Sequence, residues 1–171
     1  MKTLLIALNA KYIHSNLGVY CIAAYAREHG ITEEELQKAE YTINQPLEKI
    51  MADIYEKKPD FLAFSCYVWN INRIIQLTRE LRKVLPDVPI WLGGPEVTYQ
   101  PEEIMQKVPW VTGIIMGEGE ATCLELVQSY SREGSDVNLS EIAGIAYRDG
   151  KQIRIGKKRP LLSLDEVPFP Y

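Results

Sequence analysis

The feature that most constrains the fold is a repeated pairing of a short apolar run with a segment of helical period. The run TLLIAL at residues 3–8 and the run FLAFSC within residues 59–66 are almost continuously apolar. Strands that are apolar on both faces are typical of a parallel sheet buried between helices. Similar strands are expected around residues 38–43, 88–94 and 111–117, and helices over residues 17–28, 47–58, 70–85, 101–107 and 118–130.

Five such pairs predict an α/β fold of the flavodoxin-like (Rossmann-like) kind, which is a doubly wound, five-stranded parallel sheet with the strand order 2-1-3-4-5. The helix over residues 47–58 has the clearest pattern, because Leu47, Ile50 and Ile54 follow helical spacing on one face. The start of the second strand is open, because TEEELQ at residues 32–37 is also compatible with a helix.

The alternation of apolar runs with helical segments ends after Gly134. Residues 142–155, IAGIAYRDGKQIRI, contain two short strand-like runs around Asp149-Gly150, a common hairpin turn. The predicted organisation is therefore an α/β domain over residues 1–133, a β-hairpin appendage over residues 134–158, and a linker over residues 159–171. The linker contains three prolines and shows no period.

The net charge, the apolar segments and the cysteines argue against several classes of function. A formal net charge of -4 provides no basic surface for nucleic acid. No apolar stretch approaches the roughly 20 residues that a membrane span needs, and the N-terminal apolar run is too short for a signal peptide. Cys21, Cys66 and Cys123 are widely spaced without a CxxC pair, which argues against a disulfide framework and a structural zinc site. A cytoplasmic location without a nucleic-acid or membrane partner is expected.

The candidate site lies in the segments that follow strands one, three, four and five, because ligands of open α/β sheets bind beyond the carboxyl ends of the strands. These segments combine glycines with aromatic rings and small polar side chains, which suits a large amphipathic cofactor. The candidate cofactor-binding residues are Asn9, Tyr12, His14, Ser15, Asn16, Gly18, Ser65, Cys66, Tyr67, Trp69, Asn70, Gly93, Gly94, Pro95, Glu96, Gly117, Glu118 and Gly119.

Several of these residues also have a purely structural explanation. GGP at residues 93–95 is by itself a common turn, and Cys66 can be a small core residue. Glu118 and Glu120 suit the positive end of a helix better than acid–base catalysis. His14 has no second ligand at zinc spacing. No GxGxxG follows the first strand and no GxxxxGK[ST] occurs, so dinucleotide binding of the Rossmann type is disfavoured and a P-loop is excluded. No catalytic and no metal-ligating residue is assigned.

Four stretches carry a resemblance to a known family: LLIALNAKYIHSNLG, KPDFLAFSCYVWN, VPIWLGGPEVTYQPEEI and GIIMGEGEATCLELV. The combination of LGGPEV and GEGE is the most specific of these signals. On these motifs the chain resembles the N-terminal cobalamin-binding domain of B12-dependent radical SAM proteins. That group includes anaerobic magnesium-protoporphyrin IX monomethyl ester cyclases.

The resemblance implies that this domain positions cobalamin (vitamin B12) for methyl transfer or a related radical step in a longer enzyme. The corrin would lie over residues 65–70, 93–96 and 117–119, and the nucleotide tail near residues 9–18. LLSLDEVPFPY, residues 161–171, resembles the segment that leads to the radical SAM domain. The CxxxCxxC motif is missing. S-adenosylmethionine and a 4Fe-4S cluster are therefore expected in that intramolecular partner domain, and the chain alone is not expected to be catalytic.

Other functions stay open at this point. The DxHxxG motif, whose histidine binds cobalt from below in methionine-synthase-type domains, is missing, which counts against such a role for His14. The alternatives are a flavodoxin-like module that binds FMN and a cofactor-free platform for the radical SAM barrel. A signalling receiver is disfavoured, because Asn9-Ala10 and Ser65-Cys66 stand where its acidic pair and its phosphoacceptor would be.

Overall fold

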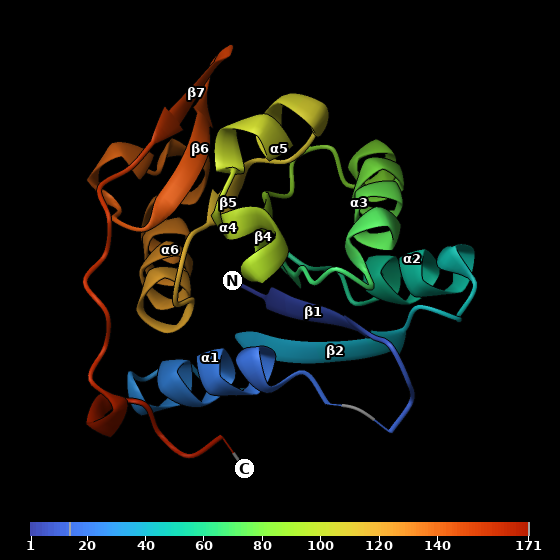
Figure 1. The fold of residues 1–171 in the computed structure, drawn as a ribbon, viewed down its shortest axis with the longest axis horizontal. Helices are drawn as coiled ribbons and strands as arrows, with labels where there is room; N and C mark the ends of the chain where they lie inside the picture. Colours follow the sequence, from blue (N-terminus) through green and yellow to red (C-terminus); the bar gives the residue numbers. More distant parts are fainter. Residues whose placement is uncertain (14, 171) are drawn as a thin grey trace.

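The computed structural model describes residues 1–13 and 15–170 and has three layers, with one sheet between two sets of helices (Figure 1). The sheet has seven strands in the order β2-β1-β3-β4-β5-β6-β7. Strands β1 to β5 are parallel, whereas β6 and β7 are antiparallel. The strands are β1 (Thr3–Asn9), β2 (Leu36–Thr42), β3 (Phe61–Ser65), β4 (Ile90–Gly93), β5 (Gly113–Ile115), β6 (Ile145–Asp149) and β7 (Gln152–Ile155).

Helices cover both faces of the sheet (Figure 1). One face carries α1 (Leu17–Glu28) and α6 (Glu120–Glu133), and the other carries α2 (Leu47–Glu56), α3 (Ile71–Val84), α4 (Pro95–Thr98) and α5 (Pro101–Lys107). Each face has its own apolar cluster, and the side chains of β1 alternate between the two. No helix in the described residues is long and apolar enough to cross a membrane.

The predicted order of the parallel strands is confirmed. Strand β1 is buried at every position, as its continuous apolar run predicts. Strand β2 lies at the sheet edge and begins at Leu36, and the residues TEEE before it form no helix. Helix α4 was not predicted, because its four residues are too few to show a helical period.

The predicted hairpin is present and continues the sheet, because β6 pairs with β5 and β7 pairs with β6. Asp149 pairs with Gln152, so the two-residue loop is Gly150-Lys151, one residue later than the sequence indicates. Gly150 has a φ of 59°, the left-handed conformation that tight hairpins need at this position. The domain boundaries after residues 133 and 158 stay a prediction.

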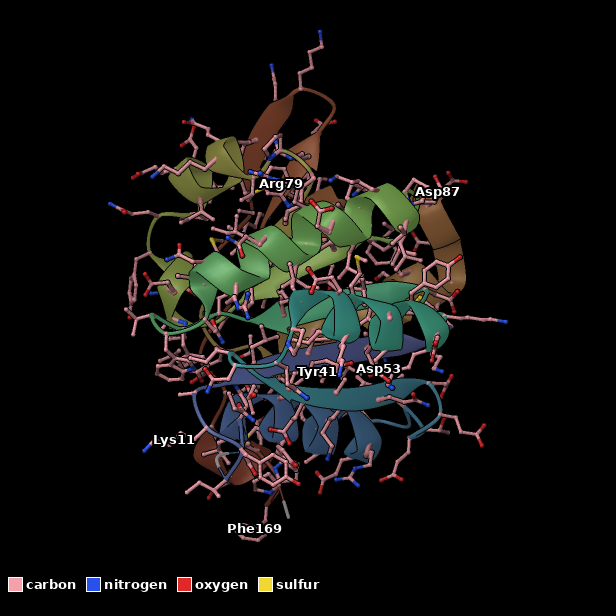
Figure 2. The ribbon with its side chains drawn as sticks, turned by 90° about the vertical axis from the view of Figure 1, so that its right-hand side faces the viewer. Lys11, Tyr41, Asp53, Arg79, Asp87 and Phe169 are labelled. Atoms are coloured by element: carbon pink, nitrogen blue, oxygen red, sulfur yellow. The ribbon has the colours of Figure 1, made fainter. Side chains whose placement is uncertain are left out.

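Polar contacts also fix α2 over the edge strand β2 (Figure 2). The Tyr41 hydroxyl donates to Asp53 Oδ2 at 2.5 Å, and Lys57 Nζ donates to Asp53 Oδ1 at 2.7 Å. The hydrogen bonds from Lys57 and then from Tyr41 hold the pKa of the Asp53 carboxyl below its ordinary value. The Tyr41–Asp53 hydrogen bond therefore joins α2 to β2, in addition to the apolar packing on this face of the sheet.

Candidate functional site

A cavity of about 420 Å³ opens at the carboxyl ends of β3, β4 and β5 and reaches Leu5 in the middle of β1. It lies on the sheet face that carries α1 and α6, next to the crevice between β1 and β3 where the strand order reverses. Open α/β sheets bind their ligands at such a switch point. The volume also falls in the range of small-molecule sites, about 300–1,000 Å³.

The floor of the cavity is apolar and consists of small and medium-sized side chains. Leu5, Ala63 and Ile115 come from β1, β3 and β5, and Val19 and Cys123 come from α1 and α6. Burial, followed by the nearby Glu120 carboxylate, raises the pKa of Cys123 to about 12, so its thiol stays protonated at neutral pH. A floor without charge suits a flat apolar ring.

The loop after β3 is held by Asn70, which is fully buried. The Asn70 side-chain amide donates to the carbonyls of Leu8 and Ser65, each at 3.0 Å, and its oxygen accepts from the backbone amide of Tyr67 at 2.8 Å. Asn70 thus clamps the ends of β1 and β3 together and does not line the cavity. The neighbouring Cys66 is also fully buried, and burial raises the pKa of its thiol.

The loop after β4 packs backbone against backbone on the loop after β3. Gly94 has φ 100° and ψ 174°, a conformation that essentially only glycine adopts. A Cβ on Gly94 would lie 2.6 Å from the Cys66 carbonyl oxygen. The Cys66 amide donates to the Gly93 carbonyl at 2.7 Å, and the Glu96 amide donates to the Cys66 carbonyl at 3.3 Å. The second glycine of GGP is therefore required by the protein's own packing, and Pro95 directly begins α4.

The loop after β1 is fastened by Glu40 of β2, a residue that no sequence motif marks. The Glu40 carboxylate accepts from the Asn9 side-chain amide at 2.9 Å, from the Asn16 backbone amide at 3.0 Å and from the Tyr20 hydroxyl at 2.7 Å. Burial raises the pKa of Glu40, but these donors hold it below its ordinary value overall. Asn16 also caps α1, because its side chain accepts from the Val19 amide.

The loop after β5 brings two carboxylates to the cavity. Glu118 is exposed and accepts a hydrogen bond from the Leu162 amide at 2.9 Å. Glu120 is half-buried, and this burial raises the pKa of its carboxyl, with the charge of Glu118 adding to the effect. A Cβ on Gly119 would lie 2.8 Å from Ile22 Cδ1, so the start of α6 lies against α1.

Exposed aromatic rings stand around the cavity. Tyr67 and Trp69 stack with ring centroids 4.5 Å apart and an interplanar angle of 12°. Trp69 is 47% exposed, whereas Tyr99 is 85% exposed and Tyr12 is 93% exposed. Tyr67 and Tyr99 line the cavity itself. These rings provide flat apolar surface for a ligand that extends beyond the cavity.

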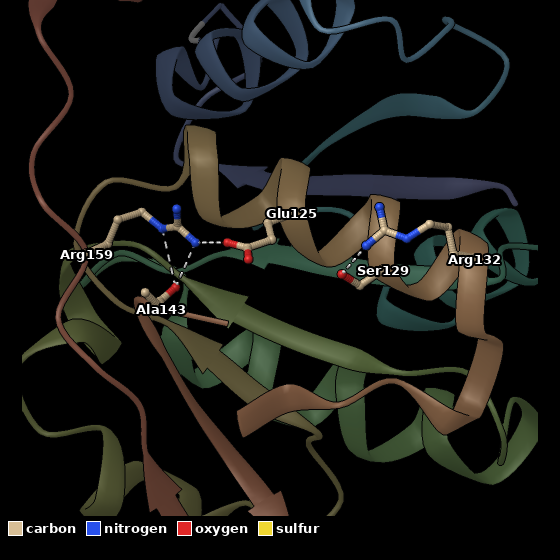
Figure 3. A network of polar contacts seen from close by, with 5 residues as sticks. All are labelled: Glu125, Ser129, Arg132, Ala143 and Arg159. Atoms are coloured by element: carbon tan, nitrogen blue, oxygen red, sulfur yellow. Dashed lines mark hydrogen bonds and ion pairs between the residues drawn. The ribbon is translucent and has the colours of Figure 1, made fainter. Parts of the chain in front are cut away.

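The segment after β7 forms one side of the cavity, and residues 157–162 are here named the C-terminal strap. Arg159 donates to the Glu125 carboxylate and, at 3.1 Å, to the Ala143 carbonyl (Figure 3). This contact ties the strap to α6 and places Leu161 at the cavity. A second cavity of about 290 Å³ lies between the strap and the hairpin and shares Leu161 with the first.

The structure brings half of the predicted site residues together. Those that line the cavity are Gly18, Ser65, Tyr67, Gly93, Gly94, Pro95, Gly117, Glu118 and Gly119. Those buried in the framework of the rim are Asn9, Asn16, Cys66 and Asn70, and those exposed outside the lining are Tyr12, Ser15, Trp69 and Glu96. His14 lies outside the described residues. The binding role of all of these residues stays a prediction.

Sequence reasoning missed the lining residues that lie inside strands and helices. They are Leu5, Val19, Ile22, Ala63, Phe64, Thr98, Ile115, Glu120 and Cys123. The apolar members look like ordinary core residues in sequence, and the one local signal is the small Ala63 between the bulky neighbours of β3. Within residues 1–13 and 15–170, no group of three or more His, Cys, Asp or Glu side chains is placed to hold a metal ion.

A family profile and several known proteins match this chain. The family profile of the B12 binding domain matches residues 3–127. The cobalamin-dependent radical SAM methyltransferase TokK of Streptomyces tokunonensis is 30% identical over 156 residues, which cover 88% of this chain and 22% of TokK. The anaerobic magnesium-protoporphyrin IX monomethyl ester cyclase of Rubrivivax gelatinosus is 26% identical over 151 residues, which cover 85% of this chain and 26% of the cyclase. The chain thus spans about a quarter or less of the length of these relatives.

Solved structures show the same fold. The cobalamin-dependent S-adenosylmethionine radical enzyme OxsB, with aqua-cobalamin and S-adenosylmethionine bound, has a TM-score of 0.77 at 17% identity, covering 98% of this chain and 23% of OxsB. The radical S-adenosylmethionine methyltransferase TsrM from Kitasatospora setae, with cobalamin and a [4Fe-4S] cluster bound, has a TM-score of 0.75 at 14% identity, covering 98% of this chain and 31% of TsrM. At these identities the similarity establishes the fold alone.

Proposed function

The chain belongs to the B12 binding domain family, and we propose that it binds cobalamin and positions it for methyl transfer or a related radical step in a longer radical SAM enzyme. The observation that carries the proposal is the open cavity at the switch point of the sheet. That cavity is formed by β1, β3, β4, β5, α1 and α6, all of which begin within the matched residues 3–127.

The cavity fits the nucleotide tail of cobalamin, which ends in a flat aromatic base. The floor of Leu5, Ala63 and Ile115 is apolar and uncharged, so it suits such a base. Gly18 forms part of the entrance, and a Cβ there would meet only ordinary contacts of 3.5 Å or more, so the backbone is open to a ligand. We therefore assign the tail to the cavity between α1 and α6.

The corrin is too wide for the cavity and would lie over its rim. The loops after β3, β4 and β5 provide that rim, and Asn70 and the close approach at Gly94 hold the first two of these loops in place. The stacked rings of Tyr67 and Trp69 and the exposed ring of Tyr99 offer apolar surface at its edge. A rim that is rigid before binding loses little freedom when the ligand arrives.

When bound, cobalamin supplies a cobalt centre that can accept and release a methyl group. The residues of this chain hold the cofactor, orient it and exclude water from its tail. The Cys66 thiol is buried and its pKa is raised, so it does not offer a thiolate to the rim. In the proposed full-length enzyme, S-adenosylmethionine and the 4Fe-4S cluster are bound by a downstream domain that the C-terminal strap would join.

A retention experiment separates this proposal from its alternatives. The chain is mixed with hydroxocobalamin, desalted, and measured by visible absorption spectroscopy, and a parallel sample is mixed with FMN. Retained corrin absorbance without retained flavin is the expected result. Retained flavin without corrin would support the FMN module. Retention of neither would leave the cofactor-free platform as the remaining function.

A further inference from the structure

Of the two carboxylates among the described residues that line the cavity, Glu118 is exposed at the rim and Glu120 is half-buried below it. Glu120 is the first residue of α6 and stands three residues before Cys123, so the two side chains occupy the same helix face, one turn apart. Cys123 is fully buried at the floor, whereas Gly117 and Glu118 are exposed at the rim. The Glu120 carboxyl therefore lies at an intermediate depth of the cavity.

Within the described residues, no side chain donates a hydrogen bond to Glu120 and no cation pairs with it. The raised pKa of Glu120 comes first from burial and then also from the charge of Glu118, while its own backbone amide and that of Gly119 act in the opposite direction. The thiols of Cys21 and Cys123 face the same carboxylate, which raises the pKa of both beyond the effect of their burial. A half-buried carboxylate without a strong donor costs stability, so a ligand that donates a hydrogen bond there would remove that cost.

The surroundings of Glu120 restrict what such a ligand can be. The described residues that line the cavity include no Lys and no Arg. A phosphate in direct contact with the Glu120 carboxylate would therefore meet like charge with no cationic side chain to offset it. A neutral hydroxyl or amide fits, because a carboxylate accepts hydrogen bonds and offers none when ionised.

We propose that Glu120 accepts a hydrogen bond from a hydroxyl of the ribose in the nucleotide tail, and that it thereby makes the site selective for corrinoids that carry a nucleotide. This inference rests on the proposed function. In the proposed binding mode the base lies on the floor, so the ribose bonded to it would lie near the depth of Glu120 and the phosphate would lie nearer the rim. Carboxylates recognise ribose hydroxyls in the same way in other nucleotide-binding α/β folds.

The test measures the dissociation constants of three corrinoids by visible titration. They are hydroxocobalamin, cobinamide, which has the same corrin but no nucleotide, and a cobamide that contains adenine in place of dimethylbenzimidazole. The variants are Glu120→Ala and Glu120→Gln, and Glu133→Ala at the exposed far end of α6 is the matched control. The urea midpoint of each variant checks the fold, and Glu120→Gln keeps the shape of the side chain in case Glu120→Ala does not fold.

Glu120→Ala should lower the affinity for both nucleotide-containing corrinoids about tenfold. Glu120→Gln should lower it less, because its side-chain carbonyl oxygen still accepts a hydrogen bond. Cobinamide affinity and all affinities of Glu133→Ala should be unchanged. An equal loss for cobinamide, no loss for cobalamin, or a loss confined to one base would each overturn the assignment to the ribose. Failure of the unaltered chain to bind any of the three corrinoids would instead overturn the proposed function, and this inference with it.

Discussion

Alanine in place of Gly94 should destabilise the protein through two separable effects. The first is backbone conformation, because φ 100° with ψ 174° is a region that side-chain-bearing residues avoid, at a cost of about 1–3 kcal/mol. The second is overlap, because the new Cβ would lie 2.6 Å from the Cys66 carbonyl oxygen and 3.0 Å from the Cys66 nitrogen. Both contacts are with backbone, so relief requires the two loops to separate, and overpacking of this kind costs about 1–3 kcal/mol.

Gly30→Ala is the matched control for the overlap. Gly30 also has a positive φ, 87°, but a Cβ there would meet nothing within 4 Å. Gly30→Ala should therefore lower the free energy of unfolding by about 1 kcal/mol. Gly94→Ala should lower it by about 4 kcal/mol, the sum of the conformational and overlap effects. Urea unfolding followed by circular dichroism measures both, and the slope with denaturant checks that the transition stays comparable. If Gly94→Ala proved no more destabilising than Gly30→Ala, the close packing of the loops after β3 and β4 would be refuted.

Further predictions concern charged groups around the site. The folded-state pKa of Glu40 lies below its ordinary value of 4.5. The ionised Glu40 should therefore stabilise the fold above about pH 4.5, and this contribution should be lost as the pH falls through the folded-state pKa. Glu40→Gln should remove that part of the pH dependence, as urea midpoints between about pH 3 and pH 7 would show. The pKa of Glu120 is raised, so its ionised form should destabilise the fold. Glu120→Gln should therefore raise the urea midpoint at pH 7 but not in acid, where Glu120 is already neutral. A lower midpoint of Glu120→Gln at pH 7 would show that the ionised carboxylate does not destabilise the fold. Arg159→Ala should release the C-terminal strap, so amide exchange of residues 157–162 should accelerate while that of β1 stays slow; unchanged exchange in the strap would show that Arg159 does not anchor it.

Much of the fold could be predicted because its signals are local and periodic. The continuous apolar runs of β1 and β3 require burial on both faces, and burial on both faces requires a parallel sheet covered by helices. The hairpin carries its own turn signal at Gly150. Helix α4 and the start of β2 could not be predicted with equal accuracy, because a four-residue helix has no measurable period and an edge strand is only partly buried.

The sequence placed the candidate site at the carboxyl ends of the strands, but it did not show which residues line the cavity. The rule that ligands bind at the carboxyl ends of the strands pointed to loops that contribute residues to the cavity, yet it could not separate residues that line the cavity from residues that hold the loops. Asn70 and Asn9 are polar loop residues whose partners, Leu8 and Glu40, are distant in sequence. Gly94 lines the cavity, but the sequence could not show that the Cys66 backbone occupies the space that a Cβ at this position would need.

In the proposed binding mode, the cavity between α1 and α6 takes the nucleotide tail of cobalamin. The most direct test is the ratio of cobinamide to cobalamin dissociation constants in the unaltered chain and in Ala63→Leu, which would fill the floor of the cavity. Ala52→Leu on the exposed face of α2 is the control. Ala63→Leu should weaken the binding of cobalamin by about tenfold or more and leave cobinamide affinity unchanged. If Ala63→Leu folds and its preference for cobalamin over cobinamide equals that of the unaltered chain, the tail does not lie in this cavity.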